Sequence, residues 1–142
     1  MPLTNRSTLS SFDAEGVLRA VEETVSGPLY SFCEYDTESF RPIFVSDEAV
    51  AMYEDREAMV EHFELIHGHV HMDFMQIQLF RNTLFPGAER VEYIATSMDF
   101  MKILRVYIGE EGLFVAVGPD EPVEPIVDAI KGVVGWPPNQ NS

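Results

Sequence analysis

The four histidines of the chain lie within a stretch of ten residues, at His62, His67, His69 and His71. Neutral imidazole is the commonest side-chain ligand for transition metals in proteins. Side chains two residues apart on a β-strand point to the same side, so His69 and His71 could share one tetrahedral ion, and His67 could join them if the strand begins early enough. The spacing therefore allows a divalent-metal site at His67, His69 and His71, in a metal-binding protein or a metal-dependent hydrolase.

Other interpretations of this cluster remain open. Gly68 favours a helix-to-strand turn, in which His67 would point away from the other two imidazoles. The His-Glu-x-x-His helix of the thermolysin type is absent, because Phe63 follows His62. The histidines can also be polar side chains at a helix end, where positive charge suits the helix dipole, or a pH-sensitive contact. We expect the histidines to be polar side chains at a helix end, and we expect no cofactor.

No other motif supports an enzyme. The sequence has no phosphate-binding loop, no dinucleotide fingerprint and no Cys-x-x-Cys pair, and the single cysteine, Cys33, excludes an internal disulfide. Glu34, Asp36 and Glu38 are typical of a solvated acidic turn. The methionines could line an adaptable binding surface, although core filling is the expected use. The notable ones are Met72, Met75, Met98 and Met101.

The charge balance limits the partners and the habitat. The chain of 142 residues has 24 Asp and Glu against 9 Lys and Arg, a formal net charge of -15, and its aromatic content of 11% is too high for a disordered acidic tail. No basic stripe is present, so we expect no nucleic-acid partner. At about 1 M salt the Debye length falls to about 3 Å and repulsion among the carboxylates is largely screened. The composition favours the cytoplasm of a halophile; the alternative is an ordinary acidic protein.

Membrane association is not expected either. No apolar run reaches the roughly 18 residues that a membrane span needs, and the first residues lack the apolar stretch of a signal peptide. We therefore expect a cytoplasmic protein with one domain over residues 11–135, between flexible termini at 1–10 and 136–142.

Hydrophobic spacing predicts a first helix from Ala14 to Val25, capped by Ser10 or Ser11. Residues 29–35 and 40–45 predict a β-hairpin, and Pro42 predicts that its second strand lies at the sheet edge.

After this hairpin, the pattern predicts a short helix over 48–53, capped by the Ser46-Asp47 pair, and a helix over 55–66 that Gly68 ends. The alternation of Met75, Ile77 and Leu79 then predicts a strand that begins at Asp73.

Two further β-segments follow, over 91–108 and 113–117, and the first can hold one strand or two. A last helix is expected after Pro122. The predicted fold is α+β, with a single antiparallel β-sheet of five or six strands, helices packed on it and the order α-β-β-α-β-β-β(-β)-α.

This order of elements over residues 11–134 resembles the profilin-like group and, within it, the roadblock modules. Val91 to Ile108 departs from the resemblance if it holds two strands, because roadblock modules would have one there. The resemblance implies a module that pairs through its second long helix and the strand after it. On that helix, Val60, Phe63 and Ile66 form the predicted interaction surface.

A second resemblance concerns residues 29–63, LYSFCEYDTESFRPIFVSDEAVAMYEDREAMVEHF. This stretch is similar to small acidic proteins of halophilic archaea that are themselves uncharacterised. The resemblance agrees with the habitat and implies no activity. We therefore expect a non-catalytic protein-interaction or regulatory module of a halophilic archaeon, as a homo-oligomer or bound to another protein. The alternatives are the metal site and a sensor domain that holds a small ligand in a cavity of a few hundred Å³.

Overall fold

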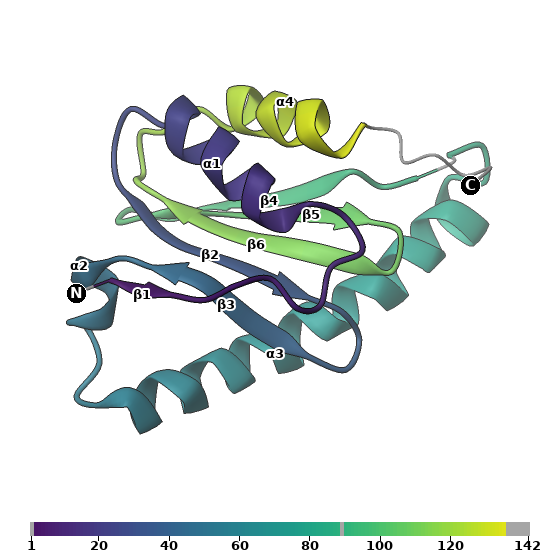
Figure 1. The fold of residues 1–142 in the computed structure, drawn as a ribbon. Coiled ribbons are helices and arrows are strands. Elements are labelled where there is room, and N and C mark those ends of the chain that lie inside the picture. Colours follow the sequence, from purple (N-terminus) through teal and green to yellow (C-terminus); the bar gives the residue numbers. More distant parts are fainter. Residues whose placement is uncertain (1, 89, 136–142) are drawn as a thin grey trace.

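A six-stranded antiparallel sheet forms the centre of the computed structural model, which describes residues 2–88 and 90–135 (Figure 1). The strands are β1 (Leu3–Thr4), β2 (Leu29–Tyr35), β3 (Phe40–Val45), β4 (Tyr93–Ser97), β5 (Lys102–Ile108) and β6 (Glu111–Val117). Their order across the sheet is β1-β3-β2-β6-β5-β4. The predicted α+β class and single antiparallel sheet are confirmed.

Helices cover the two faces of this sheet unequally. Two helices, α1 (Ala14–Thr24) and α4 (Val123–Val134), lie side by side on one face (Figure 1). The other face carries α2 (Asp47–Val50) and one long helix, α3 (Arg56–Leu79), which crosses the sheet diagonally. A π-helical segment, η1 (Phe80–Leu84), extends α3. No helix within 2–88 and 90–135 has the length and apolar character to cross a membrane.

The α1 and α4 face encloses the larger apolar core. Val17 and Val21 of α1 and Ile126 and Ile130 of α4 have no exposed surface. They pack on alternate residues of the strands, as the period of two along a strand requires. The cap of α1 differs from the prediction: the side chain of Asp13, instead of Ser10 or Ser11, accepts the hydrogen bond from the Gly16 amide.

The predicted strand from Asp73 is wrong, because α3 continues through it to Leu79. The alternation of apolar residues there has a helical explanation. Ile77 packs against the sheet together with Phe74, three residues earlier, whereas Met75 is exposed on the far side. Gly68 does not end the helix: a glycine inside a helix costs only about 1 kcal/mol relative to alanine, and packing of the sheet-facing residues outweighs that cost.

The strands predicted before and after α3 are confirmed. The hairpin of β2 and β3 has the predicted bounds, and residues 91–108 hold two strands, β4 and β5. Pro42 is not on the outermost strand, because β1 pairs with β3 at Phe44 and Val45. It lies beyond that short ladder, where its carbonyl accepts a hydrogen bond from the Asn5 side chain.

Residues 2–10, where we expected a flexible terminus, carry β1 and a hydrogen-bonded segment. The Glu34 carboxylate is fully buried and accepts from the hydroxyls of Ser7 and Ser10 at 2.7 Å each and from the amides of Thr8, Leu9 and Ser10. Burial acts to raise the pKa of Glu34, but these hydrogen bonds lower it overall. Glu34 is thus not a residue of a solvated turn. The other predicted flexible terminus, 136–142, lies outside the described residues.

Candidate functional site

The sheet-facing side of α3 determines which of its residues are available to a partner. Phe63 is only 7% exposed, and its ring centroid lies 5.8 Å from that of Phe40 in β3. Ile66 is half-buried against the same sheet face. Only Val60 of the predicted interaction surface is exposed, at 46%. The surface made of Val60, Phe63 and Ile66 is therefore not a free face of the helix, because the last two residues hold α3 on the sheet.

The opposite side of α3 carries exposed apolar residues instead. Leu65, Met72, Met75 and Leu79 are 62%, 57%, 66% and 48% exposed, and Gly68 lies between the first two with open space around it. We call these five residues the outer stripe. A surface helix with one packed face normally has polar residues on the other. Here an apolar stripe runs along the far side as well, which makes the outer stripe the leading candidate for a contact with another molecule.

The structure separates the predicted metal ligands. All four histidines lie on α3, where successive residues are about 100° apart around the axis, so His69 points away from His67 and His71. His67 Nε2 is 2.9 Å from the carbonyl oxygen of Asp36, and its ring centroid is 6.4 Å from that of His71. Within 2–88 and 90–135 no three His, Cys, Asp or Glu side chains are placed to hold an ion. Strand geometry was the premise of the converging site, and that premise is wrong.

A buried polar network joins the second half of α3 to the sheet. Asp73 is 5% exposed, and its Oδ2 accepts from Arg105 Nη1 at 2.7 Å and from the hydroxyl of Tyr107 at 2.5 Å. Burial, with nearby Tyr35 and Asp73, raises the pKa of Tyr107, which therefore stays a neutral donor. In the described part of the chain the Tyr35 hydroxyl and Arg105 Nε find no hydrogen-bond partner. This network fixes the position of α3 but leaves donors unused.

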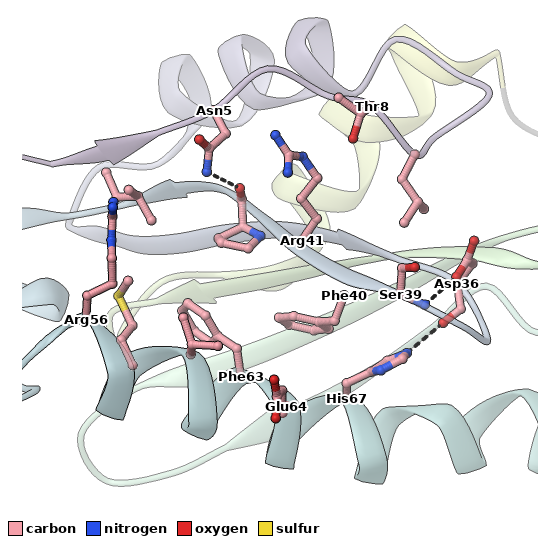
Figure 2. Close-up of a pocket in the computed structure, with 15 residues that line it drawn as sticks. Asn5, Thr8, Asp36, Ser39, Phe40, Arg41, Arg56, Phe63, Glu64 and His67 are labelled. Carbon is pink, nitrogen blue, oxygen red and sulfur yellow. Dashed lines mark hydrogen bonds between the residues drawn. The ribbon is translucent and has the colours of Figure 1, made fainter.

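Two clefts flank α3, one on each side. The first, of about 920 Å³, lies towards β3 and the N-terminal segment (Figure 2). Figure 2 shows His67 reaching from α3 towards Asp36, with Phe63 and Phe40 between the helix and the strand. Its walls carry both signs of charge: Arg41 and Arg56, but also Asp36 and Glu64. This mixture favours no single class of ligand.

The second cleft, of about 740 Å³, lies towards β5 and β4 and is mostly apolar. Its floor is the sheet, where Ile103 and Phe114 lie, and Leu65 belongs to its α3 wall. Exposed Met52 and Phe100 stand at its rim.

Cys33, the single cysteine, is fully buried. Burial, with the neighbouring Glu34, raises the pKa of its thiol, so Cys33 is not a reactive thiol.

The outer stripe was missed because the prediction divided it: Leu65 was placed in a helix that Gly68 ends, and Met75 and Leu79 were placed in a strand that begins at Asp73. The signal was present: from Leu65 to Leu79 the stripe recurs at alternating intervals of three and four residues, which is the spacing of a helix-pairing seam. Met72 and Met75 belong to this surface, so the alternative of an adaptable binding surface fits them better than core filling.

Comparison with known proteins extends the description of the fold. No protein-family model matches the sequence, and no protein of curated function matches it. Among solved structures, a Roadblock/LC7 domain from Streptomyces avermitilis aligns with a TM-score of 0.56 at 11% identity, over 84% of this chain and 89% of that one. The gliding protein mglB from Thermus thermophilus aligns with a TM-score of 0.56 at 12% identity, over 94% of this chain and 98% of that one. At these identities the likeness is one of fold, and the chain adopts a Roadblock/LC7-like α+β fold.

Proposed function

We propose that this chain is a non-catalytic protein-interaction or regulatory module that self-associates through the outer stripe of α3. The observation that carries the proposal is the exposure of four large apolar side chains on the side of α3 that faces away from the sheet. Burying exposed apolar surface contributes roughly 25 cal/mol per Å², so a second helix laid along the stripe would gain free energy from each of the four.

The spacing of the stripe supports a helix as the partner element. Leu65, Gly68, Met72, Met75 and Leu79 occupy alternating positions of a heptad repeat, so they form one continuous seam over about four turns. Gly68 would let two helix backbones approach closely at that point, because it has no side chain and no other part of the fold lies within 4 Å of where its Cβ would be. A second copy of the chain supplies an identical seam, which is the simplest complement in a two-fold pair.

The sheet edge beyond β5 provides a second contact. Among the described strands β4 pairs only with β5, and three of its residues, Ala95, Thr96 and Ser97, are exposed. The free amide and carbonyl groups of an edge strand can pair with a strand of another chain. The resemblance to roadblock modules implies pairing through these same two elements, the long helix and the strand that follows it. That implication agrees with the stripe on α3.

The net charge of -15 supports a halophilic habitat for the module. Repulsion between copies of so acidic a chain is screened when the Debye length shrinks to a few Å in molar salt. We expect the melting temperature to rise between 0.1 M and 2 M KCl by several degrees, since a gain of 1 kcal/mol shifts the midpoint of a domain of this size by about 4 °C. An unchanged melting temperature would favour an ordinary acidic protein.

Sedimentation in 2 M KCl tests the self-association. The unmodified chain should sediment as a dimer, and Met75→Glu should weaken the dimer on the order of tenfold or more, because two like charges would meet in an apolar seam. Val133→Glu is the matched control: Val133 is an exposed apolar residue of α4, on the other face of the sheet. A monomeric unmodified chain, or equal loss in both variants, would contradict the proposal.

A further inference from the structure

The apolar cleft between α3 and β5 differs in charge from the rest of the molecule. The chain has 24 Asp and Glu among 142 residues, yet the described residues that line this cleft include neither. They do include Arg105, with His62 and His69 on the α3 side. In so acidic a protein, a cleft without carboxylates is the place where an anion meets the least repulsion.

The arginine of this cleft is not saturated by its protein partner. A guanidinium has five N–H donors, and Arg105 gives one of them, on Nη1, to Asp73. Its Nε is buried and has no hydrogen-bond partner within the described residues, whereas the side chain as a whole remains 19% exposed, so a ligand in the cleft would meet the Nη donors and not Nε. A second acceptor at this position would therefore satisfy donors that Asp73 leaves unused.

The other residues that line the cleft indicate that the rest of the ligand is apolar. Phe63, Ile66, Ile103 and Phe114 line the cleft, and its volume of about 740 Å³ lies within the range of small-molecule sites. Polar groups are few, as in sites where shape and apolar contact provide affinity and one charged group fixes the orientation. The cavity also meets the size that the sensor alternative requires.

We propose that this cleft binds a single-chain apolar carboxylate, with its chain along the floor and its carboxylate towards Arg105. The cleft is separate from most of the outer stripe: it opens beside α3, whereas the outer stripe lies on the side of α3 away from the sheet. Leu65 of the outer stripe lines the cleft, and so does Thr96 of the β4 edge.

Calorimetric titration of the full chain with decanoate, below its micellar concentration, tests the proposal. We expect saturable binding of one decanoate per chain, about tenfold tighter than binding of decyltrimethylammonium, because a hydrogen bond to a charged group contributes about 1.5 kcal/mol. Phe100→Glu should weaken decanoate binding by a similar factor. Phe100 is 56% exposed at the rim, outside α3, so the substitution leaves the core intact.

Met75→Glu is the matched control, with the same added charge on an exposed apolar residue that does not line the cleft. It should leave decanoate binding unchanged while it weakens self-association, and Phe100→Glu should do the reverse. Absence of saturable decanoate binding, equal affinity for the cationic amphiphile, or equal effects of the two variants would overturn the proposal. If decanoate fails to bind and Phe100→Glu dissociates the dimer, the cleft is a contact between copies of the chain instead.

Discussion

The two faces of the sheet differ in how completely they are packed. On the α1 and α4 face, the inward side chains of both helices have no exposed surface, and the buried Glu34 carboxylate accepts five hydrogen bonds. On the α3 face, one helix crosses the strands and leaves a cleft on each side. The buried network around Asp73 there leaves the Tyr35 hydroxyl without a partner in the described part of the chain.

The same sheet therefore carries one fully packed face, under α1 and α4, which we call the finished face, and one partly packed face, under α3, which we call the unfinished face. A finished face contributes mainly to stability, since large residues that are fully buried leave nothing for a partner to cover. An unfinished face exposes apolar side chains that leave water only when another molecule covers them. We therefore place both proposed contacts of this protein on the α3 face.

Truncation of one apolar side chain on each face should reveal the contrast most strongly. Ile126→Ala removes a side chain with no exposed surface from the α4 core, and we expect the free energy of unfolding to fall by about 4 kcal/mol. Met72→Ala removes a side chain that is 57% exposed on α3, and the loss in dilute protein should be below about 0.5 kcal/mol.

Urea denaturation of both variants at low protein concentration measures this difference. At high concentration, where the dimer is populated, Met72→Ala should become the more damaging of the two for association. Equal losses of unfolding free energy in dilute protein would mean that the α3 face is as fully packed as the other, and the comparison would fail.

The buried carboxylate gives the finished face a pH dependence. The pKa of Glu34 is lowered in the folded state, so its hydrogen bonds stabilise the fold at every pH above the ordinary carboxyl value of about 4.3, and this contribution disappears as the pH falls through the lowered value. Glu34→Gln should cost about 2 kcal/mol at pH 7, because it removes charge-assisted hydrogen bonds.

Denaturation at pH 7, 5 and 3 checks the sign of this effect. The gap between the unmodified chain and Glu34→Gln should be constant from pH 7 to 5 and narrow towards pH 3. Glu38→Gln, at an exposed position of the same hairpin, is the control and should cost little at any pH. A gap that widens on acidification would contradict the assigned role.

How far the sequence predicts the structure also differs between the two faces. The elements of the finished face were predictable because their periodicity was unambiguous: Val17 and Val21 on one helix, Ile126 and Ile130 on another, with the strands between them. On this face the helices and strands that the local spacing predicts are the same ones that the packed core stabilises.

On the unfinished face the spacing was ambiguous. Met75, Ile77 and Leu79 alternate as in a strand, although in the helix Ile77 faces the sheet and the other two are exposed. Gly68 suggested a break that long-range packing overrides. The metal site failed with that strand, because its geometry depended on a period of two. Phe63 and Ile66 were correctly identified as one helical stripe, but periodicity does not tell whether a stripe faces the core or a partner. The spacing of the outer stripe is present in the sequence, but its exposure and the absence of carboxylates from the apolar cleft follow only from the position of α3 on the sheet.

One glycine on each face allows a comparison of the two faces with the smallest expected effect. Gly68 in α3 and Gly132 in α4 are both exposed inside a helix, and nothing lies within 4 Å of the position where a Cβ would be. Replacing either with alanine should therefore raise the unfolding free energy of the dilute protein by roughly 0.5–1 kcal/mol, since alanine is the better helix former. On the finished face this gain should persist at every protein concentration. On α3 it should shrink as the dimer forms, because the added methyl group lies in the seam and holds the two helix backbones apart. Concentration-dependent melting of Gly68→Ala beside Gly132→Ala measures this directly, and identical curves would place the partner somewhere other than the outer stripe.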